Sequence, residues 1–352
     1  MRLSRRDVLK VSAALAASKV FAEPARAAAP PATTITPALV EAAKKEGKVV
    51  WYTSVDLPLA ERIAKAFEAK FPGVACRVER SGAERVFQRI GQEYGSNIHA
   101  VDVVNSSDAA HLIVWKDKGW LEPFLPEDVA RHFPAEHKDP DGTYASFRVF
   151  LCPIAYNTSL VKAEEAPKSY ADLLDPKWVG KIVKAHPGYS GTILTATFQM
   201  ARDIGWEYFE KLAAQRIMQV QSAADPPKKL ALGERAIMAD GVEYAVFQLK
   251  ESGQPVEPVY PTEGTPLIVG PNGIFKGAPN PNAARLLQCY MFSSECQQLG
   301  IDYGGLRSVH ALTREKPGRK PLSAIKLMKD DPAAVEKQGA DIKARYSKIF
   351  RV

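Results

Sequence analysis

The sequence predicts an α/β protein made of two units. Between residues 48 and 118, short apolar runs alternate with amphipathic segments in the order strand, helix, strand, helix, strand, helix. Alternation of this kind is typical of a doubly wound parallel sheet with right-handed crossovers. The pattern changes near residue 144 and then resumes, which indicates a second α/β unit. A chain of 352 residues is long enough for two ordinary domains.

The first unit is predicted from local patterns, element by element. A helix over residues 37–46 ends at Gly47, and the apolar run over 48–53 is typical of a buried strand that leads into a polar loop. The elements that follow are a helix over 59–71 stopped by Pro72-Gly73, a strand over 74–78, a helix over 83–94, a strand over 101–104 and a helix that ends at Lys118.

The second unit begins with a long, mostly apolar strand-like run over residues 147–156. A strand over 182–185 then leads into a helix that starts at Thr192. The remaining predicted elements are a strand over 236–239, a helix over 241–251, an extended return over 253–270, helices over 282–292 and 295–300, and a charged helical tail from Lys316 onward.

Residues 1–27 have the pattern of a secretory signal peptide. A basic start is followed by a short apolar run over 11–22 and by Ala25-Arg26-Ala27, where a signal peptidase would cut. The pair Arg5-Arg6, with Leu9 and Lys10 after it, looks like a twin-arginine signal; an ordinary export signal with an accidental arginine pair is the alternative. We therefore expect a periplasmic chain with a flexible leader over residues 28–36.

Charge and hydropathy exclude two classes of partner. The net charge is +7, but six basic and two acidic residues lie within residues 1–27, so most of this charge belongs to the signal. The rest has no concentrated basic patch, and we expect no nucleic-acid partner. No segment after the signal approaches about eighteen consecutive apolar residues, so no membrane-spanning helix is expected.

The four cysteines do not form a recognisable metal or redox motif. There is no C-x-x-C pair, and Cys289 and Cys296 lie seven positions apart; on one continuous helix the rise between them would be about 10.5 Å, which is too long for a disulfide. Burial as small apolar side chains is the favoured interpretation. A bridge between Cys76 and Cys152 stays open.

Candidate ligand contacts follow the ends of the predicted strands. In open parallel sheets ligands bind beyond the carboxyl ends of strands, where helix N-termini offer free N–H groups. For any single loop, simple helix capping is the more favoured explanation, but five such loops converging from two units favour a site. The residues so identified are Thr53, Ser54 and Asp56; Ser81 and Gly82; Asn105, Ser106 and Ser107; Ser190, Gly191 and Thr192; and Asp240.

Enzymatic motifs are absent from the sequence. There is no G-x-S-x-G, no G-x-x-x-x-G-K-[ST] and no H-E-x-x-H. His186 lies near Ser190, which leaves a periplasmic hydrolase as a weak alternative, but no orienting acid can be named. We expect no catalytic residues, no cofactor and no resident metal.

Several stretches, in their order and spacing, resemble one protein family. They are residues 49–54, 155–158, 170–182, 260–266, 273–280 and 294–297. Together they cover nearly all of the chain after the signal. The sequence resembles the periplasmic solute-binding proteins of ABC importers, in the branch that includes ferric-iron, thiamine, phosphonate and sugar-phosphate binders.

The resemblance implies a type II periplasmic binding protein-like fold, with two doubly wound lobes joined by two crossover segments and a ligand clamped between them. The crossovers are expected near residues 144–156 and 248–266. Lobe 1 would then comprise residues 37–146 plus 260–352, and lobe 2 residues 147–259. The implied function is capture of a small polar or anionic solute by a monomer and its delivery to an ABC permease in the inner membrane.

The resemblance also suggests ligand residues outside the five loops, namely Tyr156, Tyr244 and Glu263. Aromatic candidates for the cleft wall are Trp51, Tyr52, Tyr156, Tyr189 and Tyr244, with core packing as the alternative for Trp51 and Tyr244. The family's ferric-iron members carry two adjacent tyrosines, and only Tyr244 stands at the matching position. Ferric iron needs several anionic oxygens, so an iron carrier that uses Tyr244 is the second choice behind an organic solute.

Overall fold

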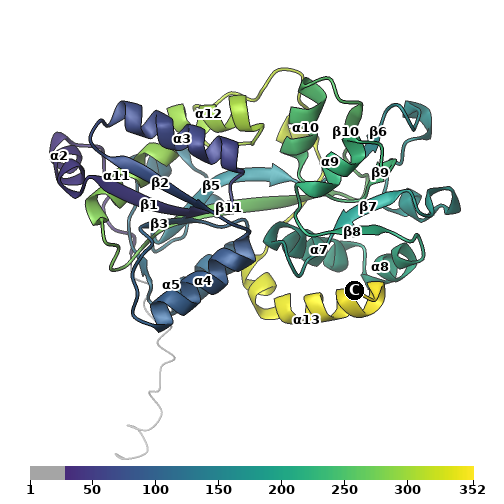
Figure 1. Ribbon diagram of the computed structural model, residues 1–352, viewed down its shortest axis with the longest axis horizontal. Helices are drawn as coiled ribbons and strands as arrows, with labels where there is room; N and C mark the ends of the chain where they lie inside the picture. Colours follow the sequence, from purple (N-terminus) through teal and green to yellow (C-terminus); the bar gives the residue numbers. More distant parts are fainter. Residues whose placement is uncertain (1–27) are drawn as a thin grey trace, which may run out of the picture.

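The computed structural model describes residues 28–352, which form two lobes lying side by side (Figure 1). The predicted signal peptide, residues 1–27, lies outside the described residues. Figure 1 shows α3 and α12 on one side of the first sheet and α4 and α5 on the other, which confirms the expected α/β layering. In the second lobe, α9 and α10 lie above the sheet, and α7, α8 and α13 lie below it.

The first lobe is built on a sheet of seven strands in the order β12-β11-β3-β1-β2, with β4 and β5 also paired to β11. β1, β2 and β3 are parallel, as predicted, whereas β11 runs antiparallel to β3 and β5. The elements of this lobe are α2 (Pro37–Glu46), β1 (Lys48–Thr53), α3 (Leu57–Lys70), β2 (Ala75–Arg80), α4 (Ala83–Gly95), β3 (Val103–Asn105), α5 (Ala109–Asp117), β4 (Leu121–Glu122), α6 (Glu127–His132), β5 (Tyr144–Leu151), β11 (Thr265–Phe275), α11 (Pro281–Phe292), α12 (Ser294–Gly304) and β12 (Leu327–Met328).

The second lobe is built on a five-stranded sheet in the order β10-β6-β9-β7-β8. β7 is parallel to β8 and β9, while β6 and β10 are antiparallel to their neighbours, so both sheets are mixed. The elements of this lobe are β6 (Ile154–Asn157), β7 (Ile182–Ala185), α7 (Gly191–Asp203), α8 (Trp206–Ala213), β8 (Met218–Val220), α9 (Asp225–Ala231), β9 (Ile237–Met238), α10 (Glu243–Glu251) and β10 (Val256–Val259).

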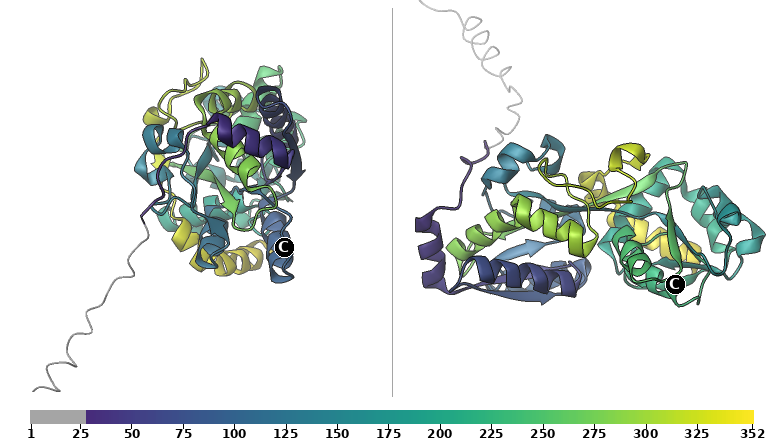
Figure 2. Two further views of the ribbon diagram at one scale, coloured as in Figure 1. Left: turned by 90° about the vertical axis from the view of Figure 1, so that its left-hand side faces the viewer. Right: turned by 90° about the horizontal axis from the view of Figure 1, so that it is seen from above.

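Two crossings join the lobes. The chain leaves the first sheet where β5 ends at Leu151 and enters the second where β6 begins at Ile154. It returns between the end of β10 at Val259 and the start of β11 at Thr265. The first crossing follows β5 and the second precedes β11, and these two strands pair along most of their length. The two crossings therefore lie next to each other at the junction of the lobes. Seen from above, the molecule is elongated along the line of its two lobes (Figure 2).

Local sequence signals explain why helices begin where the cleft will form. Asp108 caps α5 by accepting a hydrogen bond from Ala110 N (3.0 Å), and Ser190 caps α7 by accepting one from Ile193 N (3.4 Å). Both caps follow the carboxyl end of a parallel strand. These loops therefore do cap the helices, as the alternative interpretation expects. They also place the helix N-termini at the sheet edges that face the other lobe.

The C-terminal region differs from the prediction. Residues 316–331 form mostly irregular chain instead of a helix, because Pro317, Gly318 and Pro321 interrupt it. The last helix, α13 (Pro332–Phe350), was assigned to the first lobe, but it packs against α7 and α8 of the second lobe as well as α5 of the first. The predicted flexible leader also differs, because Thr33 N donates to Leu125 O (2.8 Å).

All four cysteines are buried and free, so Cys76 and Cys152 are not bridged. Burial raises the pKa of Cys76 and of Cys289 to about 12, which keeps both thiols protonated and unreactive. Among residues 28–352 there is no helix long and apolar enough to cross a membrane.

Candidate functional site

A cavity of about 620 Å³ lies between the two lobes. The first lobe and β5 line it with Ser54, Arg80, Gly82, Ala83, Glu84, Arg85, Gln88, Ser107, Arg148 and Phe150. The second lobe lines it with Gly188, Tyr189, Ser190, Gly191, Thr192, Gln221, Ser222, Ala223, Ala224, Asp225, Val242 and Tyr244.

The position of the cavity follows from the direction of the strands. Ser54, Arg80 and Ser107 stand at the carboxyl ends of β1, β2 and β3, and Ser190 stands just beyond β7. These polar loop tips face one another across the gap, as expected for open sheets. β5, the strand that leads to the first crossing, also borders the cavity and contributes Arg148 and Phe150.

Arg148 is the most unusual charge in the cavity. Its side chain is buried, with 3 % of the residue exposed. Nη2 donates to Ser54 Oγ (2.8 Å), but Nε has no hydrogen-bond partner, and no carboxylate within the described chain forms an ion pair with it. Burial lowers the pKa of Arg148 to about 10. The guanidinium is therefore still charged at neutral pH and has unused hydrogen-bond donors.

Gly270 makes the position of Arg148 possible. A Cβ at Gly270 would lie 2.8 Å from both Cγ and Nε of Arg148 and 3.2 Å from the backbone oxygen of Ser106. The ladder between β5 and β11 is also irregular at Gly270/Pro271. A bulge and a glycine at this point let a long side chain lie flat against the partner strand.

Two more arginines line the cavity near Arg148. Arg80 donates from Nε to Val55 O (3.4 Å), and Arg85 stands in the first turn of α4. Neither forms an ion pair with a carboxylate in the described part of the chain. Tyr244 packs edge-on against Phe150 with ring centroids 5.8 Å apart, and burial raises the pKa of its phenol to about 12. The first lobe and the crossover strand thus give the cavity three guanidinium groups.

The lobes touch where α7 begins. A Cβ at Gly191 would lie 2.7 Å from Asp108 Cβ and 3.5 Å from Ala83 Cβ, both in the first lobe. Only a residue without a side chain allows this close approach. The N-terminal N–H groups of α7 therefore face the cavity from the second lobe, opposite the arginines.

About half of the predicted ligand residues line this cavity. They are Ser54, Gly82 and Ser107 from the first lobe, and Ser190, Gly191, Thr192 and Tyr244 from the second. Of the predicted aromatic wall, Tyr189 also lines it and is 59 % exposed. Trp51 and Tyr52 are buried in the core of the first lobe instead.

The other first-lobe candidates lie outside the lining, because their side chains stabilise the loops themselves. Thr53 Oγ1 accepts from Val55 N (3.0 Å), and Asn105 Nδ2 donates to Gly270 O (3.0 Å). Ser106 Oγ lies 2.9 Å from His111 Nδ1. Asp56 and Ser81 are also absent from the lining; Asp56 makes no ion pair with Arg148, although its charge acts on Arg148 from a distance.

Three further candidates, two in the second lobe and one in the return crossing, lie away from the cavity. Asp240 is completely buried and forms an ion pair with Lys184 (2.6 Å). Tyr156 packs in the core of the second lobe. Glu263 Oε1 accepts from Ala171 N (3.1 Å) in the return segment.

Sequence reasoning missed the cavity's arginines and one whole loop. Arg148 is a single charge within the apolar run 147–151, and an isolated arginine in a buried strand is a signal that points to a site. The loop over residues 221–225 was missed because β8 is short and half-buried, so its sequence lacks a strand pattern.

The arrangement does not form a nucleophile–base pair. Ser190 Oγ caps α7, and His186 Nδ1 accepts from Gly188 N (2.8 Å) while Nε2 lies 3.4 Å from Ser347 Oγ. Within residues 28–352 no hydrogen bond joins His186 to Ser190. The geometry therefore gives the hydrolase alternative no support.

One group of potential metal ligands borders the cavity. Single ligand atoms of Glu84, Asp108 and His111 lie within 4.8 Å of one another. Lys343 Nζ, from α13, is 3.0 Å from Glu84 Oε2, so the chain already places a cation beside this group. Burial alone would raise the pKa of Glu84, but His111 and Lys343 together hold it at about 2.

Comparison with known proteins identifies the family. The model for bacterial extracellular solute-binding proteins matches residues 101–318, more than half of the chain. The chain belongs to this family. It is a solute-binding protein of the ABC importer type, for which a small-molecule ligand and a membrane permease are the implied partners.

Individual relatives cover most of this solute-binding protein. An uncharacterised protein of Haemophilus influenzae is 28 % identical over 313 residues, 85 % of this chain and 88 % of the relative. Iron uptake protein A1 of Synechocystis is 24 % identical over 285 residues, 76 % of each chain. Among solved structures, the periplasmic binding protein AfuA of Actinobacillus pleuropneumoniae, with fructose-6-phosphate bound, has a TM-score of 0.79 at 25 % identity and covers 87 % of this chain and 99 % of its own.

A second solved structure shares the fold at lower identity. Iron-bound HitA from Pseudomonas aeruginosa has a TM-score of 0.75 at 21 % identity and covers 86 % of this chain and 99 % of its own. The relatives thus include a protein with a sugar phosphate bound and proteins named for iron. The two-lobed fold agrees with both, and the cavity residues must distinguish between them.

Proposed function

We propose that this solute-binding protein captures a small anionic organic solute, with Arg148 as the principal contact for the anion. The observation that carries the proposal is the guanidinium of Arg148, which is buried at the cavity and forms no ion pair with a carboxylate of residues 28–352. Burying an unpaired charge is costly, so such a group is retained where a ligand of opposite charge completes it. Carboxylate and phosphate groups match the fork of donors on a guanidinium.

The charge balance of the cavity supports an anion. Both acidic side chains of the lining already have partners in the structure: Glu84 pairs with Lys343 (3.0 Å), and Asp225 Oδ2 accepts from Ser222 N (3.1 Å). Arg80 and Arg85 add positive charge and form no ion pair within residues 28–352, and the N-terminus of α7 adds free N–H groups. AfuA, a relative with a sugar phosphate bound, agrees with this ligand class.

The size of the cavity supports an organic solute over a bare inorganic ion. A volume of about 620 Å³ falls in the range of small-molecule sites and is far larger than one phosphate group. Hydroxyl and amide groups from Ser190, Thr192 and Gln221 line the second-lobe wall. The solute would touch both walls only when the lobes are together, and its binding would shift the population toward the closed form.

A ligand panel tests the proposal directly. Isothermal titration calorimetry of the chain without its signal would compare fructose 6-phosphate, a phosphonate and a dicarboxylate with the cation thiamine. We expect at least one organic anion to bind with micromolar or tighter affinity, and thiamine to show none. The proposal would be contradicted if thiamine binds and none of the anions gives a binding signal.

An iron carrier is the alternative function, and Tyr244 is the residue on which it depends. Tyr244 lines the cavity, but Arg80, Arg85 and Arg148 surround the site with positive charge that opposes a ferric ion. Iron-loaded protein would show a phenolate charge-transfer band that Tyr244→Phe removes. A colourless sample after incubation with ferric citrate would dismiss this alternative.

We further propose export by the twin-arginine route. The support is the pair Arg5-Arg6 before a short apolar run, in a chain whose family acts outside the cytoplasm. Replacing both arginines with lysine should retain the precursor in the cytoplasm, as followed by cell fractionation. Unchanged export of this variant would indicate the ordinary secretory route.

A further inference from the structure

The last helix, α13, is attached firmly to the second lobe. Tyr346 is completely buried, packs with Phe209 and donates from its hydroxyl to Gln219 Oε1 (3.0 Å). Arg345 Nη2 lies 3.4 Å from Glu210 Oε1 of α8. Gly339 lies so close to α7 that a Cβ there would be 3.5 Å from Leu194. These contacts predict that α13 moves with the second lobe.

The same helix also reaches the first lobe. Val335 and Ile342 share a small apolar cluster with Leu194 and Phe198 of α7 and with Ala110 of α5. Lys343 Nζ forms an ion pair with Glu84 Oε2 at 3.0 Å, at the start of α4. Figure 1 shows α13 beneath the second lobe, on the same side of the molecule as α4 and α5. α13 therefore contacts both halves of the cleft without contributing to its lining.

Opening of the cleft would separate these two sets of contacts. The attachment to the second lobe includes a fully buried tyrosine, whereas the contact with the first lobe consists of the packing of α13 against α5, which includes Ala110, and one ion pair with α4. One of the two sets must break when the lobes separate, because packed cores do not deform continuously. The ion pair between Lys343 and Glu84 joins the two lobes, so an opening that moves α4 away from α13 would break it.

We propose that Lys343 is a positioning residue that holds the lobes closed and orients Glu84 at the wall of the solute cavity. The inference goes beyond capture of an anion, because it assigns a role to a helix that does not touch the solute. It rests on the two-lobed binding mechanism but not on the chemical class of the ligand.

The surroundings make this ion pair stronger than an exposed one. The side chain of Glu84 is 14 % exposed and that of Lys343 is 32 % exposed. His111 Nε2 and Asp108 Oδ2 lie 3.6 Å apart, and His111 Nε2 is also 3.6 Å from Glu84 Oε1. Partial burial reduces screening by solvent, so the pair should favour closure by about 5- to 10-fold in the ratio of closed to open protein.

The experiment measures closure without any solute. All four native cysteines are buried, so Lys65→Cys in α3 and Glu164→Cys in the second lobe, both at exposed positions, can carry a pair of fluorophores. Single-molecule energy transfer then gives the ratio of closed to open molecules in the unliganded protein. Lys343→Ala should lower this ratio about 5- to 10-fold, Lys343→Glu should lower it further, and Lys343→Arg should restore it.

Arg345→Ala is the matched control. It removes an ion pair from the same helix, but its partner Glu210 lies in the second lobe, so the closed fraction should not change. Equal effects of Lys343→Ala and Arg345→Ala would overturn the proposal, as would a wild-type protein without any detectable closed population. Since no solute is present, failure of the anion assignment in a ligand panel would leave this result unaffected.

A kinetic readout separates positioning from general stability. With any solute that binds, Lys343→Ala should speed dissociation about 5- to 10-fold and change the association rate little, because association begins with the open form. The melting temperature of the unliganded variant should stay within a few degrees of the wild type. A slower association rate with unchanged dissociation would contradict the role of Lys343 in closure.

Discussion

Two buried arginines beside the same strand have opposite environments. Arg148 lies in β5 and is 3 % exposed, and Arg307 is 1 % exposed and pairs through its backbone with Val149 of β5. Arg307 donates from Nε and Nη2 to both oxygens of Glu243 (2.9 Å each) and from Nη1 to Glu315 (2.7 Å). Among the described residues, Arg148 donates only to the hydroxyl of Ser54. The same residue type is therefore fully paired on one side of the strand and unpaired on the other.

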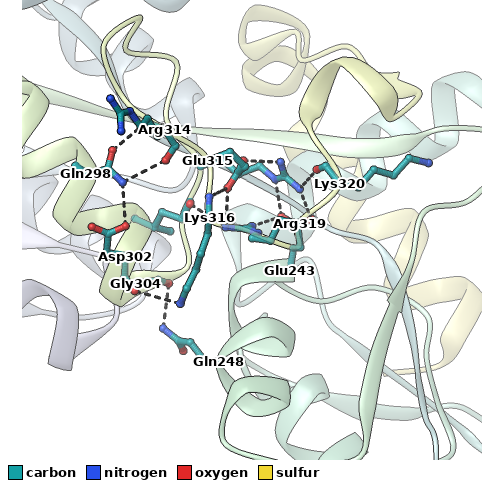
Figure 3. A network of polar contacts seen from close by, with 12 residues as sticks. Glu243, Gln248, Gln298, Asp302, Gly304, Arg314, Glu315, Lys316, Arg319 and Lys320 are labelled. Carbon is teal, nitrogen blue, oxygen red and sulfur yellow. Dashed lines mark hydrogen bonds and ion pairs between the residues drawn. The ribbon is translucent and has the colours of Figure 1, made fainter.

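The difference in pairing suggests that Arg307 has a structural role, whereas Arg148 is available to contact a ligand. Glu243, Glu315 and Arg319 form the network in Figure 3, where Glu243 from the second lobe meets the segment that follows α12. Tyr260 adds a hydrogen bond to Glu243 Oε1 (2.6 Å), so this carboxylate has several donors. Burial would raise the pKa of Glu243, but Arg307 and Arg319 lower it. A network of this kind fixes the junction of the lobes, and its arginines are paired with carboxylates of the chain itself.

The largest effect is expected from breaking the paired side. Glu243→Gln leaves Arg307 and Arg319 buried without a carboxylate between them, and removing one partner of a buried ion pair typically costs about 3–5 kcal/mol. Urea unfolding should show this loss in the free energy of unfolding. Arg148→Met, measured in parallel, should be neutral or slightly stabilising, because it removes a charge that has no partner in the unliganded protein. Similar losses of unfolding free energy for the two variants would show that Arg148 and Glu243 do not differ in their structural role.

Solute affinity should show the reverse order. Arg148→Met is expected to weaken binding of an anionic solute about 100-fold, equivalent to about 2.7 kcal/mol, because the charged hydrogen bonds are lost. Arg148→Lys should restore only part of the affinity, since an ammonium lacks the planar fork of donors. Calorimetric titration of both variants provides the measurement. Full affinity in Arg148→Met would show that the anion binds elsewhere.

A half-buried acidic residue, Asp330, offers a comparison in which the charge is negative. Asp330 lies before α13 and forms no ion pair within residues 28–352; burial, aided by the charge of Asp108, raises its pKa from 3.8 to about 7. Between pH 4 and pH 7 the folded protein keeps a proton that the unfolded chain releases, so stability falls as the pH rises through this window. Asp330→Asn removes that dependence.

The expected gain from Asp330→Asn is on the order of 2 kcal/mol at pH 8 and much smaller at pH 4. Urea unfolding of wild type and variant at the two pH values measures it. Asp331→Asn is the control for loss of a neighbouring carboxylate, because Asp331 caps α13 by accepting from Ala334 N (3.1 Å), a role that asparagine can keep. A gain that is equal at both pH values would indicate a cause other than titration of Asp330.

The sequence was sufficient for the fold and for part of the site, and the physical reason lies in the range of the interactions. Caps such as Ser190 and glycines such as Gly191 act locally, so the loop tips that carry them were predicted and do line the cavity. Asp240 was misjudged because its partner Lys184 is 56 positions away. The arginines were missed for the same reason, since whether a charge has a partner depends on tertiary contacts.

The C-terminal helix also shows that local sequence does not reveal long-range contacts. α13 is helical, as its charged, amphipathic sequence predicts, but nothing in that sequence indicates that it packs on the second lobe. The decisive contact is Tyr346, which is buried between aromatic side chains of both α8 and the loop after β7. The local sequence pattern predicts that α13 is helical. The lobe on which it packs depends on a surface formed by residues distant in the sequence.

The smallest expected effect concerns the glycine beneath Arg148. Gly270→Ala would place a methyl group 2.8 Å from Arg148 Cγ and Nε, so the arginine must shift, and we expect solute affinity to fall about 5- to 10-fold. Gly91→Ala is the matched control. It makes the same substitution inside α4, where the added Cβ has no neighbour within 4 Å. Calorimetry on both variants should show weaker binding for the first and unchanged binding for the second. Unchanged affinity in Gly270→Ala would mean that the bound solute does not depend on the exact position of this guanidinium, and that Arg80 or Arg85 holds the anion instead.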